Sequence, residues 1–572
     1  MKDNSIIMKC CRNFLGRSNI SIRIALSAGL LSLGSYSSVD AQVNDHAFDV
    51  SSQLDVFSNA YRLLDAYYVD TLDAKNVIKD GLNAMLRSLD PYTEYYPSED
   101  EEDLKMLTQA KYGGIGSVIR MMKDSTVIIS EPYEGMPAAE VGLEAGDVLL
   151  KIDDKDLKGM ATQEVSDLLR GEPGTTFVLK YQRPGENKIR TAKITRQTIK
   201  IPALPYYGIV APKIGYMHLS QFTNDCFPYV RKAVISLKEQ GAESLILDLR
   251  ENGGGALDQA VRIVNLFVPK DVKIVETKGK VDASNFTHVA TDEPLDLNIP
   301  LVVLVNSNSA SASEIVSGAL QDLDRAVIIG TRTYGKGLVQ AIRALPYGSN
   351  MKLTTAKYYI PSGRCIQEID YKQKRQANGK QTIANGGQDS IFYTVNHREV
   401  KSGKGIMPDI EVKHDTLQNI LFYLSNDDVL IHYGTHYCQT HQKPASVSEF
   451  SLTDADFEEF KQMIIDSGFT YDRLSDKQLQ QLKKVAQFEG YYDDARAEFD
   501  SLESKLTRNL GNELDRYRKE IISIASMEIV KRWFYESGVV QQSLKDDEDL
   551  QRAIELLNNK EEYKTILGYA QQ

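Results

Sequence analysis

A run of small and hydroxylated residues at positions 306–314 is the first feature of the sequence that could carry chemistry. It reads Asn-Ser-Asn-Ser-Ala-Ser-Ala-Ser-Glu and separates an apolar stretch at 299–305 from an amphipathic stretch at 312–323. Such a junction lets the backbone turn sharply and exposes a hydroxyl, and the N-terminus of a following helix offers N–H groups that can hold an oxyanion. Serine is also a favoured helix N-cap, and the spacing alone slightly favours that simpler interpretation. Because the run holds four serines, local chemistry does not identify a nucleophile.

A serine nucleophile needs a base, and histidine is scarce in this part of the chain. Only His288 lies between His218 and His397, and the usual Gly-x-Ser-x-Gly elbow is absent. A buried lysine can replace histidine because desolvation disfavours the ammonium form and lowers the pKa of the amine. Lys336 stands in Thr-Tyr-Gly-Lys-Gly at 333–337, where glycines permit close packing and no acid is adjacent. Lys336 is therefore a candidate base, with an ordinary turn lysine as the alternative.

Two weaker patterns suggest a nucleotide and a metal. The glycines and lysine at 330, 335 and 336 have the spacing of a phosphate loop, but Gly337 stands where a serine or threonine should hold magnesium. A second group of residues could bind zinc, yet its spacing is irregular and no other cluster complements it. This group is His432, His436, Cys438 and His441. We therefore expect no nucleotide, no metal and no other cofactor.

Two glycine-rich segments could present backbone N–H groups to an anion. The segment Asp-Leu-Arg-Glu-Asn-Gly-Gly-Gly at 248–255 follows an apolar stretch and forms either an anion-binding nest or a plain tight turn. The segment Tyr-Gly-Gly-Ile-Gly at 112–116 precedes a strand-like stretch. Its N–H groups could receive a carboxylate while the strand edge pairs with an incoming peptide. Alone this is a weak signal, which the segments at 138–147 and 169–175 strengthen.

The surrounding stretches divide the chain into regions that would position these residues. Residues 42–108 have the spacing of amphipathic helices, and residues 109–200 hold short β-type runs separated by Gly, Pro and Asp. Residues 201–414 alternate strand-like and helix-like stretches, which indicates an α/β domain with a buried, largely parallel sheet. Within them, residues 366–404 are rich in Lys, Gln, Asn and Gly and predict a long mobile loop. Residues 415–572 are helical again and dense in charge.

The composition narrows the class of protein. The 572 residues carry 67 basic and 79 acidic side chains, for a net charge of −12 and no long basic block. Nucleic-acid binding is therefore not expected, since it needs cations facing phosphates. An apolar content of 42% is ordinary for a globular protein. Five cysteines in a chain of this length exclude a scaffold built on disulfides.

The N-terminus has the pattern of an export signal at residues 1–41. Basic residues precede an apolar stretch at 24–34, and Val39 and Ala41 suit the −3 and −1 positions of a signal peptidase site. The apolar stretch is too short to cross ~30 Å of hydrocarbon comfortably. We therefore expect an exported protein, with an uncleaved membrane anchor as the alternative.

In order along the chain, these segments resemble the motifs of the C-terminal processing, or tail-specific, serine proteases of bacteria and plastids. The resemblance covers roughly residues 45–412. The matching motifs are Leu-Asp-Pro-Tyr-Thr at 89–93, the two glycine segments, Ser-Ala-Ser-Ala-Ser-Glu-Ile at 309–315, Tyr-Gly-Lys-Gly-x-Val-Gln at 334–340, Tyr-Ile-Pro-Ser-Gly-Arg at 359–364 and Gly-Ile-Met-Pro-Asp at 405–409.

The resemblance implies a multi-domain α/β fold. A crotonase/ClpP-like α/β protease core would occupy residues 201–414, and a mostly-β PDZ domain would occupy residues 109–200. Helical N- and C-terminal regions would occupy residues 42–108 and 415–572, after a signal peptide at 1–41.

The resemblance also implies roles for residues of the protease core. Ser311 would be the nucleophile and Lys336 the general base, while Gln340 would orient the lysine. The backbone N–H groups of Gly254 and Ala312 would form the oxyanion hole.

In the PDZ domain, the resemblance assigns the substrate's terminal carboxylate to one short loop. That loop is Gly113, Gly114, Ile115 and Gly116. Arg170 would link peptide occupancy to the protease domain. Two positions depart from the family pattern: Gly253 stands where many members have proline, and Cys365 where serine is common.

The function implied is that of an exported serine endopeptidase, most simply in a bacterial periplasm. It would recognise the C-terminal end of protein substrates and cleave through an acyl-enzyme on a Ser–Lys dyad, without a cofactor. Its partners would be proteins or peptides with free C-termini; an adaptor protein, an oligomer and peripheral membrane proximity stay open. Two alternatives on the same fold are a catalytically inactive PDZ scaffold and a hydrophobic-ligand carrier.

Overall fold

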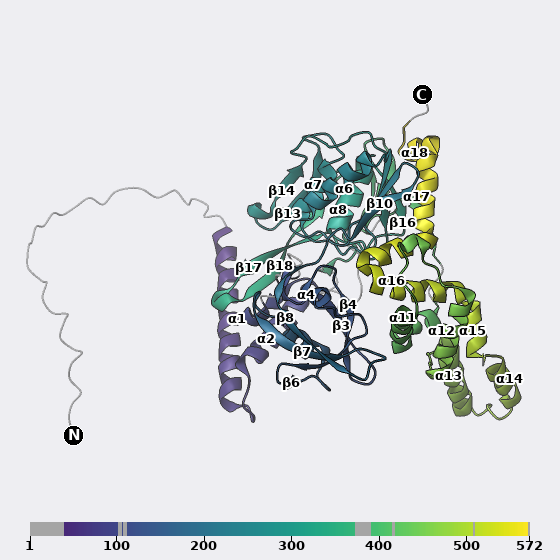
Figure 1. Cartoon of the computed structure of the whole chain (residues 1–572). Coiled ribbons are helices and arrows are strands. Elements are labelled where there is room, and N and C mark those ends of the chain that lie inside the picture. Colours follow the sequence, from purple (N-terminus) through teal and green to yellow (C-terminus); the bar gives the residue numbers. More distant parts are fainter. Residues whose placement is uncertain are drawn as a thin grey trace, which may run out of the picture. The chain divides into compact units, whose positions relative to one another are not determined.

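The computed structural model describes residues 39–100, 104, 106, 111–371, 390–414, 418–506 and 509–569 (Figure 1). The chain divides into two compact units, Met1–Ile78 and Lys79–Gln572. The smaller unit contains α1 (Val39–Tyr67) and the start of α2 (Ala74–Arg87). Residues 1–38 of the predicted signal peptide lie outside the described residues. None of the described helices is both long and apolar enough to cross a membrane.

The larger unit is built around a six-stranded sheet of order β10-β11-β12-β15-β16-β21. β10 runs antiparallel to β11, and the remaining pairs are parallel. The predicted α/β domain with a largely parallel sheet is therefore confirmed. The strands are β10 (Tyr206–Ala211), β11 (Ile214–His218), β12 (Ser244–Asp248), β15 (Leu301–Val305), β16 (Val327–Gly330) and β21 (Ile410–Glu411).

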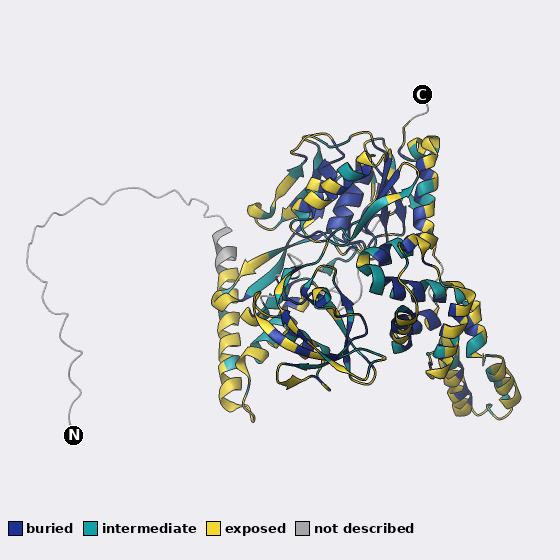
Figure 2. Ribbon diagram, in the orientation of Figure 1, coloured by how far each residue is buried: buried dark blue, intermediate teal, exposed yellow. Residues whose placement is uncertain are grey.

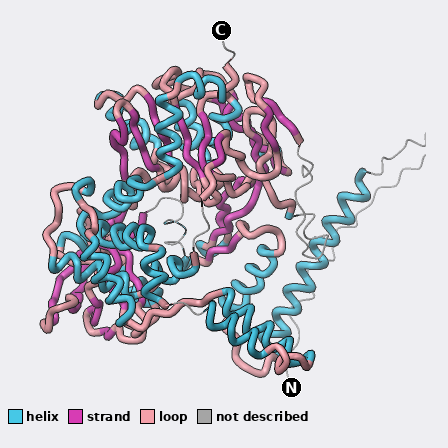
Figure 3. Tube along the Cα trace, turned by 90° about the vertical axis from the view of Figure 1, so that its right-hand side faces the viewer, coloured by secondary structure: helices cyan, strands magenta, loops and turns pink. Residues whose placement is uncertain are grey.

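Alternate side chains of the central strands pack on opposite faces of this sheet. Leu245 and Leu247 of β12 join the core with helices α6, α7 and α8. Ile246 packs instead with α17 and α18, which come from the C-terminal end of the chain. Burial on both faces explains why these strands are apolar throughout. The sheet is largely buried (Figure 2). Helices and strands are intermixed in this part of the chain (Figure 3). The helices are α6 (Phe227–Glu239), α7 (Leu257–Asn265), α8 (Ala312–Asp322), α17 (Glu548–Asn558) and α18 (Lys560–Ile566).

A second, antiparallel sheet carries the segment that follows Lys336. Its order is β1-β18-β13-β14, and β17 pairs with β18. The register places Gln340 opposite Thr354, and Glu94 opposite Lys352. The alternation of strand-like and helix-like stretches does not predict this separate sheet. Its strands are β1 (Glu94–Tyr96), β13 (Lys273–Gly279), β14 (Phe286–Val289), β17 (Leu338–Ala344) and β18 (Asn350–Tyr359).

Residues 111–200 form a compact, mostly-β module, as predicted. Its main sheet has the order β3-β4-β5-β7-β8 with β6 beside β5, while β2 pairs with β9. β3 has a strand neighbour on one side only among the described strands, and it lies against α5. The elements are β2 (Lys111–Gly114), β3 (Ser117–Met121), β4 (Val127–Pro132), α4 (Pro137–Glu140), β5 (Val148–Ile152), β6 (Lys155–Asp156), α5 (Thr162–Leu169), β7 (Thr176–Gln182), β8 (Ile189–Thr195) and β9 (Gln197–Lys200).

The C-terminal region is helical, as predicted. Helices α10–α12, α15 and α16 share an apolar core of their own. Helix α16 departs from helical geometry at Tyr535, which has φ 55° and ψ −160°. The helices before α17 are α10 (Asn419–Ser425), α11 (Asp428–Thr440), α12 (Asp454–Asp466), α13 (Leu474–Glu489), α14 (Arg496–Leu506), α15 (Leu510–Arg516) and α16 (Arg518–Ser543).

The prediction of a continuous loop at 366–404 is wrong at its C-terminal end. There β19 (Ile391–Tyr393) and β20 (Glu399–Lys401) form a hairpin. Arg398 anchors it by donating to Asp324 and Asp409, each at 2.6 Å. Ion pairs of Arg398 contribute to holding the hairpin, and its sequence is rich in polar residues, so it was not predicted. Residues 372–389 of the predicted loop lie outside the described residues.

Candidate active site

Ser311 lies at the N-terminus of α8, after the loop that leaves β15; residues 306–311 are called the serine loop below. Its φ of 56° and ψ of −111° lie outside the regions that non-glycine residues favour, so surrounding contacts must hold this backbone. Every residue of α8 is buried. The helix therefore gives Ser311 a support that cannot shift without disturbing the core.

The four serines of the cluster have different environments, which the sequence did not distinguish. Ser309 and Ser313 are fully buried, and their hydroxyls donate to backbone carbonyls of the neighbouring segment 249–255 at 2.7 and 2.8 Å. Ser307 is exposed. Ser311 is half-buried, and its Oγ has no hydrogen-bond partner among the residues that the structure describes. Two serines thus fasten the loop, whereas Ser311 keeps an unbonded hydroxyl at the helix N-terminus.

Residues 249–255, called the glycine loop below, lie directly against Ser311. A Cβ at Gly254 would be 2.8 Å from Ser311 Cβ and 2.9 Å from Ala312 N, so only glycine fits there. The Ala312 N–H has no acceptor within the described residues, as is usual at a helix start. The Gly254 N–H donates to Asn252 Oδ1 at 2.9 Å, so it becomes available to an oxyanion only when that bond breaks. The N–H of Gly253 has no acceptor in the described part of the chain.

Lys336 follows β16 and precedes β17, and its amine lies over the ring of Tyr92. Nζ is 4.4 Å from the ring centroid and donates no hydrogen bond to any described residue. Burial, together with the positive charge of Lys352, lowers the pKa of Lys336 to about 8, although the carboxylate of Glu314 acts in the opposite direction. An amine with this pKa is partly neutral near neutral pH, as a general base requires.

Two buried side chains hold Ser311 and Lys336 to each other through their backbones. The carboxylate of Glu314 accepts hydrogen bonds from the N–H of Ser311 at 2.8 Å and the N–H of Lys336 at 2.9 Å. Two further donors from the turn before Lys336 approach it at 2.6 and 2.7 Å. The hydroxyl of Tyr358, on β18, lies 3.0 Å from the carbonyl oxygen of Ser311 and 2.6 Å from that of Lys336. The same two side chains therefore fix the backbone of both residues.

Sequence reasoning missed Glu314, Tyr358 and Tyr92. Glu314 stands three residues after Ser311, which is the capping-box spacing, and that spacing was the available signal. Burial raises the pKa of Glu314 to about 7 despite its hydrogen bonds. Tyr92 and Tyr358 come from distant parts of the chain, so no local pattern connects them with the serine cluster.

Gln340 lies on β17 near Lys336, but it has a different partner. Its Nε2 donates to Thr354 Oγ1 at 3.3 Å, and that hydroxyl lies 3.3 Å from Thr93 Oγ1. Thr93 donates in turn to Asp90 at 3.1 Å. No hydrogen bond joins Gln340 to Lys336 within the described residues. The orienting role assigned to Gln340 therefore stays a prediction.

The structure brings the predicted catalytic residues of the protease core together without a direct bond between Ser311 and Lys336. Within the described residues, no hydrogen bond joins Ser311 Oγ to Lys336 Nζ, although the two backbones share two partners. An unbonded hydroxyl, an amine of lowered pKa and an unpaired helix N–H are the parts that nucleophilic attack on a carbonyl needs.

The segment predicted to bind a carboxylate links β2 to the edge strand β3. A Cβ at Gly113 would lie 2.1 Å from Gly171 O, so glycine is required where the segment touches the end of α5. Arg170 ends α5, and its guanidinium lies 5.3 Å from the ring centroid of Tyr112. The predicted residues are thus neighbours at one end of the module: Gly113, Gly114, Ile115, Gly116 and Arg170.

Contacts connect this module to the glycine loop through Asp225. Lys111 on β2 and Lys200 on β9 both pair with the Asp225 carboxylate, at 3.6 and 2.6 Å. Phe222, three residues before Asp225, donates its N–H to Gly254 O at 3.0 Å. A continuous set of contacts therefore runs from the start of the carboxylate segment to the loop beside Ser311.

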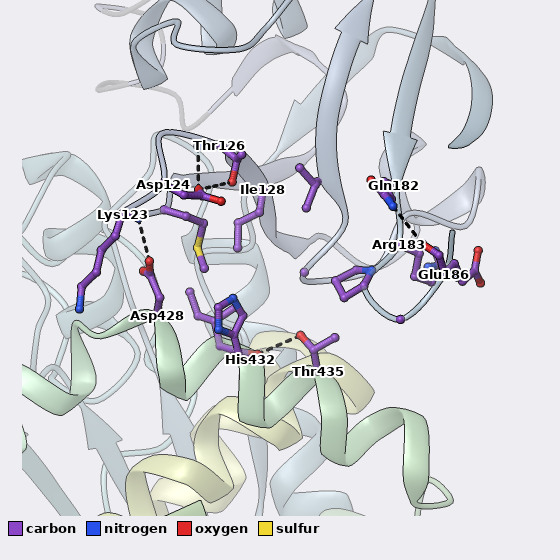
Figure 4. A pocket seen from close by; sticks show the side chains of 16 residues that line it. Lys123, Asp124, Thr126, Ile128, Gln182, Arg183, Glu186, Asp428, His432 and Thr435 are labelled. Atoms are coloured by element: carbon purple, nitrogen blue, oxygen red, sulfur yellow. Dashed lines mark hydrogen bonds between the residues drawn. The ribbon is translucent and has the colours of Figure 1, made fainter. Parts of the chain in front are cut away.

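Two cavities lie near these elements. One, of about 520 Å³, is lined by Tyr92, Tyr334 and the turn before Lys336. Another, of about 350 Å³, lies between the β module and α11, with Lys123, Asp428 and His432 in its wall (Figure 4). The Lys123 N–H donates across this junction to Asp428 Oδ2 at 2.7 Å. None of the predicted site residues lines this second cavity, so it is a junction with the C-terminal helices rather than part of the site.

The residues weighed as zinc ligands follow one another along α11 and its C-terminal end. They are His432, His436, Cys438 and His441. Among the described residues, no group of three or more histidine, cysteine or acidic side chains is arranged to hold a metal ion.

Known families match three parts of the chain. Residues 213–374 match peptidase family S41, residues 128–183 match a PDZ domain, and residues 420–557 match the C-terminal helical domain of a probable PDZ-protease. The sheet, the serine at its helix N-terminus and the β module are therefore those of a serine peptidase with a PDZ domain.

Individual relatives extend the match. A carboxy-terminal-processing protease of Bartonella bacilliformis is 37% identical over 352 residues, which are 60% of this chain and 79% of the relative. A probable CtpA-like serine protease of Staphylococcus aureus is 32% identical over 351 residues, 61% of this chain and 69% of the relative. The solved photosystem II D1 C-terminal processing protease is 28% identical, with a TM-score of 0.35, and the match covers 62% of this chain and 92% of that one. The chain belongs to the carboxy-terminal-processing serine proteases of peptidase family S41, which confirms the resemblance drawn from its motifs.

Proposed function

We propose that the chain is an exported serine endopeptidase that captures the C-terminal end of protein substrates with its PDZ domain and cleaves them with a dyad of Ser311 and Lys336. The observation that carries the proposal is the shared anchoring of these two residues by Glu314 and Tyr358. An amine with a pKa of about 8 suits proton transfer from a serine hydroxyl, and the backbones of Lys336 and Ser311 share the same two partners.

The proposed reaction runs through an acyl-enzyme. The neutral amine of Lys336, oriented by Gln340, takes the Ser311 hydroxyl proton as Oγ attacks the scissile carbonyl carbon. The carbonyl oxygen becomes an oxyanion, which the N–H of Ala312 and of Gly254 or its neighbour stabilise. As the intermediate collapses, the Lys336 ammonium gives its proton to the leaving amine. Neutral Lys336 then deprotonates a water, which releases the acyl group as a carboxylic acid and restores the Ser311 hydroxyl.

The PDZ domain would select substrates by their ends. The edge strand β3 can pair with an extended peptide while the N–H groups at 113–116 receive its terminal carboxylate. Contacts through Arg170 and Asp225 would couple peptide binding in the PDZ domain to the conformation of the catalytic residues. A bound peptide changes the equilibrium between two conformations of the protein only if it binds one of them more tightly. Amidation of a substrate's C-terminus should therefore weaken capture, and equal cleavage of the acid and amide forms would contradict this part of the proposal.

The location and partners follow from the same proposal. Export rests on the sequence pattern at 1–41, and a bacterial periplasm is the compartment that such a signal serves most simply. The substrates would be proteins with accessible C-terminal ends, presented directly or by an adaptor protein. Signal cleavage is checked by N-terminal sequencing of the mature protein, where a first residue of Gln42 is expected.

Cleavage of a fluorogenic unfolded protein tests the enzymatic proposal. Wild type should cleave it, Ser311→Ala should not, and a fluorophosphonate should label Ser311, as peptide mass spectrometry would show. The matched control is Ser307→Ala, an exposed serine of the same loop, which should keep the wild-type rate. Turnover that survives in Ser311→Ala would overturn the dyad.

The same measurements separate the alternatives. An inactive PDZ scaffold would bind the substrate without cleaving it in either variant. A hydrophobic-ligand carrier would neither cleave it nor react with the fluorophosphonate, and it would release an apolar compound on denaturation.

A further inference from the structure

Arg250 stands at the start of the glycine loop, and the C-terminal helices supply most of its partners. Nη1 donates to Asp547 Oδ1 at 2.9 Å and to Asp549 Oδ2 at 3.0 Å, and Nη2 donates to Asp547 Oδ2 at 2.5 Å. Nε and Nη2 also reach Asp248, at the end of β12, at 3.0 and 2.6 Å. All five N–H donors of the guanidinium are therefore used, in the fork geometry that suits carboxylates.

The network is buried, and apolar packing fixes where its acids lie. The side chains of Asp547 and Asp549 are 8% and 3% exposed, and that of Arg250 is 18% exposed. Asp547 is also the N-cap of α17, where it accepts the Leu550 N–H at 3.0 Å. α17 packs on the main sheet through Leu550 and the apolar residues that follow it. The two acids therefore approach Arg250 from a helix that belongs to the core.

From Arg250 the chain passes directly into contacts with the serine loop. Glu251, with a φ of 58°, accepts hydrogen bonds from two asparagine side chains of that loop at 2.6 and 2.7 Å. The carbonyl of Asn252 accepts two more, from a backbone N–H of the loop at 3.0 Å and from a serine hydroxyl of α8 at 2.8 Å. Gly254, two residues further on, lies against Ser311. A displacement of Arg250 would thus be passed along this short segment to the N–H groups beside the nucleophile.

We propose that Asp547 and Asp549 are positioning residues for peptide hydrolysis: they hold Arg250, and through it the glycine loop, where its N–H groups meet the substrate oxyanion. The inference rests on the proposed function, since it takes Ser311 as the nucleophile. It gives the C-terminal helical region a part in positioning the active site, in addition to covering the sheet. In this role each acid acts through Arg250.

The test compares two changes in the C-terminal helices. Asp547→Asn combined with Asp549→Asn removes the charges but keeps the side-chain volumes and, at 547, a residue that caps a helix equally well. The matched control is Glu562→Gln, which breaks the ion pair of Glu562 with Arg552 between α17 and α18 and leaves the partners of Arg250 in place. Three quantities are measured: the rate of Ser311 acylation by a small fluorophosphonate, amide hydrogen exchange over residues 249–255, and the melting temperature.

We expect the double variant to be acylated roughly 10-fold more slowly than wild type, because a displaced oxyanion donor weakens the transition state. The amides of its glycine loop should also exchange hydrogen faster than in wild type. Glu562→Gln should keep the wild-type acylation rate, even if both variants lower the melting temperature. Asp549→Glu, which keeps the charge, should retain more of the wild-type acylation rate than Asp549→Asn, as a positioning role requires. Wild-type acylation in the double variant, or an equal loss in Glu562→Gln, would overturn it.

Two other outcomes are also decisive. If the double variant does not fold, Asp549→Asn alone is judged by the same criteria. If Ser311 of the wild type is not acylated, the proposed function fails. Exchange of the glycine loop then still decides the inference, because unchanged exchange in the double variant overturns the link to Asp547 and Asp549.

Discussion

The two halves of the proposed dyad are held in different ways. On the serine half, the serine loop and the glycine loop exchange several hydrogen bonds, and a fully buried helix supports Ser311. On the lysine half, Lys336 leads into β17, whose outer end is exposed, and its ammonium nitrogen has no hydrogen bond to a described residue. Glu314 and Tyr358 supply the bonds between the halves. Elements of the parallel-sheet domain thus fix the position of Ser311, while the side chains of Glu314 and Tyr358 fix the position of the Lys336 backbone.

Removal of the base should have the largest effect on turnover and should leave the structure around Ser311 unchanged. Lys336→Arg keeps a positive charge that cannot be given up at working pH, so turnover should fall by roughly 10³-fold or more. Cleavage of the fluorogenic protein and the melting temperature are measured together. Turnover near the wild-type rate in a folded Lys336→Arg protein would contradict the assignment of the base.

Glu314→Gln should detach the two halves from each other. Glutamine keeps one acceptor oxygen and turns an NH₂ group toward N–H donors that the carboxylate now binds. We expect kcat to fall by roughly 100-fold with little change in KM, because the base is displaced from the nucleophile. The control is Asp456→Asn, a buried capping-box acid of α12, which should lower the melting temperature but keep kcat. Equal kcat values in the two variants would refute a special role for Glu314.

Tyr358→Phe should have a smaller effect, since it removes one of the two links. The lost hydroxyl leaves the carbonyls of Ser311 and Lys336 without this donor, and we expect a decrease of roughly 10-fold in kcat. Tyr433→Phe is the matched control: Tyr433 is equally buried, and its hydroxyl donates to a carbonyl in the C-terminal helices. If Tyr433→Phe costs as much activity as Tyr358→Phe, the effect is general destabilisation rather than placement of the base.

Lys352→Gln should shift the pH profile without lowering its plateau. The charge of Lys352 lowers the pKa of Lys336, so its removal should raise that pKa and move the rising limb of kcat/KM to higher pH. Activity at pH 7 should fall a few-fold, since less of the amine is neutral there. Lys357→Gln, an exposed position of the same strand, should leave the profile unchanged. A profile that moves to lower pH in Lys352→Gln would show that the sign is wrong.

Much of the fold was predictable because its strands and helices have strong periodicities. The parallel sheet appears as apolar runs that alternate with amphipathic stretches, and the PDZ domain as short runs between glycines and prolines. The antiparallel sheet was not predicted as a unit, since β13 and β14 have no distinct pattern and β1 joins β18 from more than 250 positions away in the sequence.

In the candidate site, too, residues in local motifs were predictable, whereas contacts between distant parts of the chain were not. Ser311 and Lys336 were found from motifs, but spacing alone favoured an N-cap over a nucleophile. The hydrogen bonds of Ser309 and Ser313 to the glycine loop separate them from Ser311, and those bonds depend on tertiary structure. Tyr92, Tyr358 and Arg250 act across long sequence separations, so their contacts became visible only in the folded chain.

The most direct test of the account is the pH dependence of Ser311 acylation, followed with a small fluorophosphonate that needs neither the PDZ domain nor a protein substrate. The central claim is that neutral Lys336 activates Ser311. The acylation rate of wild type should therefore rise with pH and reach half its plateau near pH 8, and Lys336→Arg should lack this rise. A flat profile, a midpoint near the ordinary lysine value of 10.5, or the same rise in Lys336→Arg would contradict it.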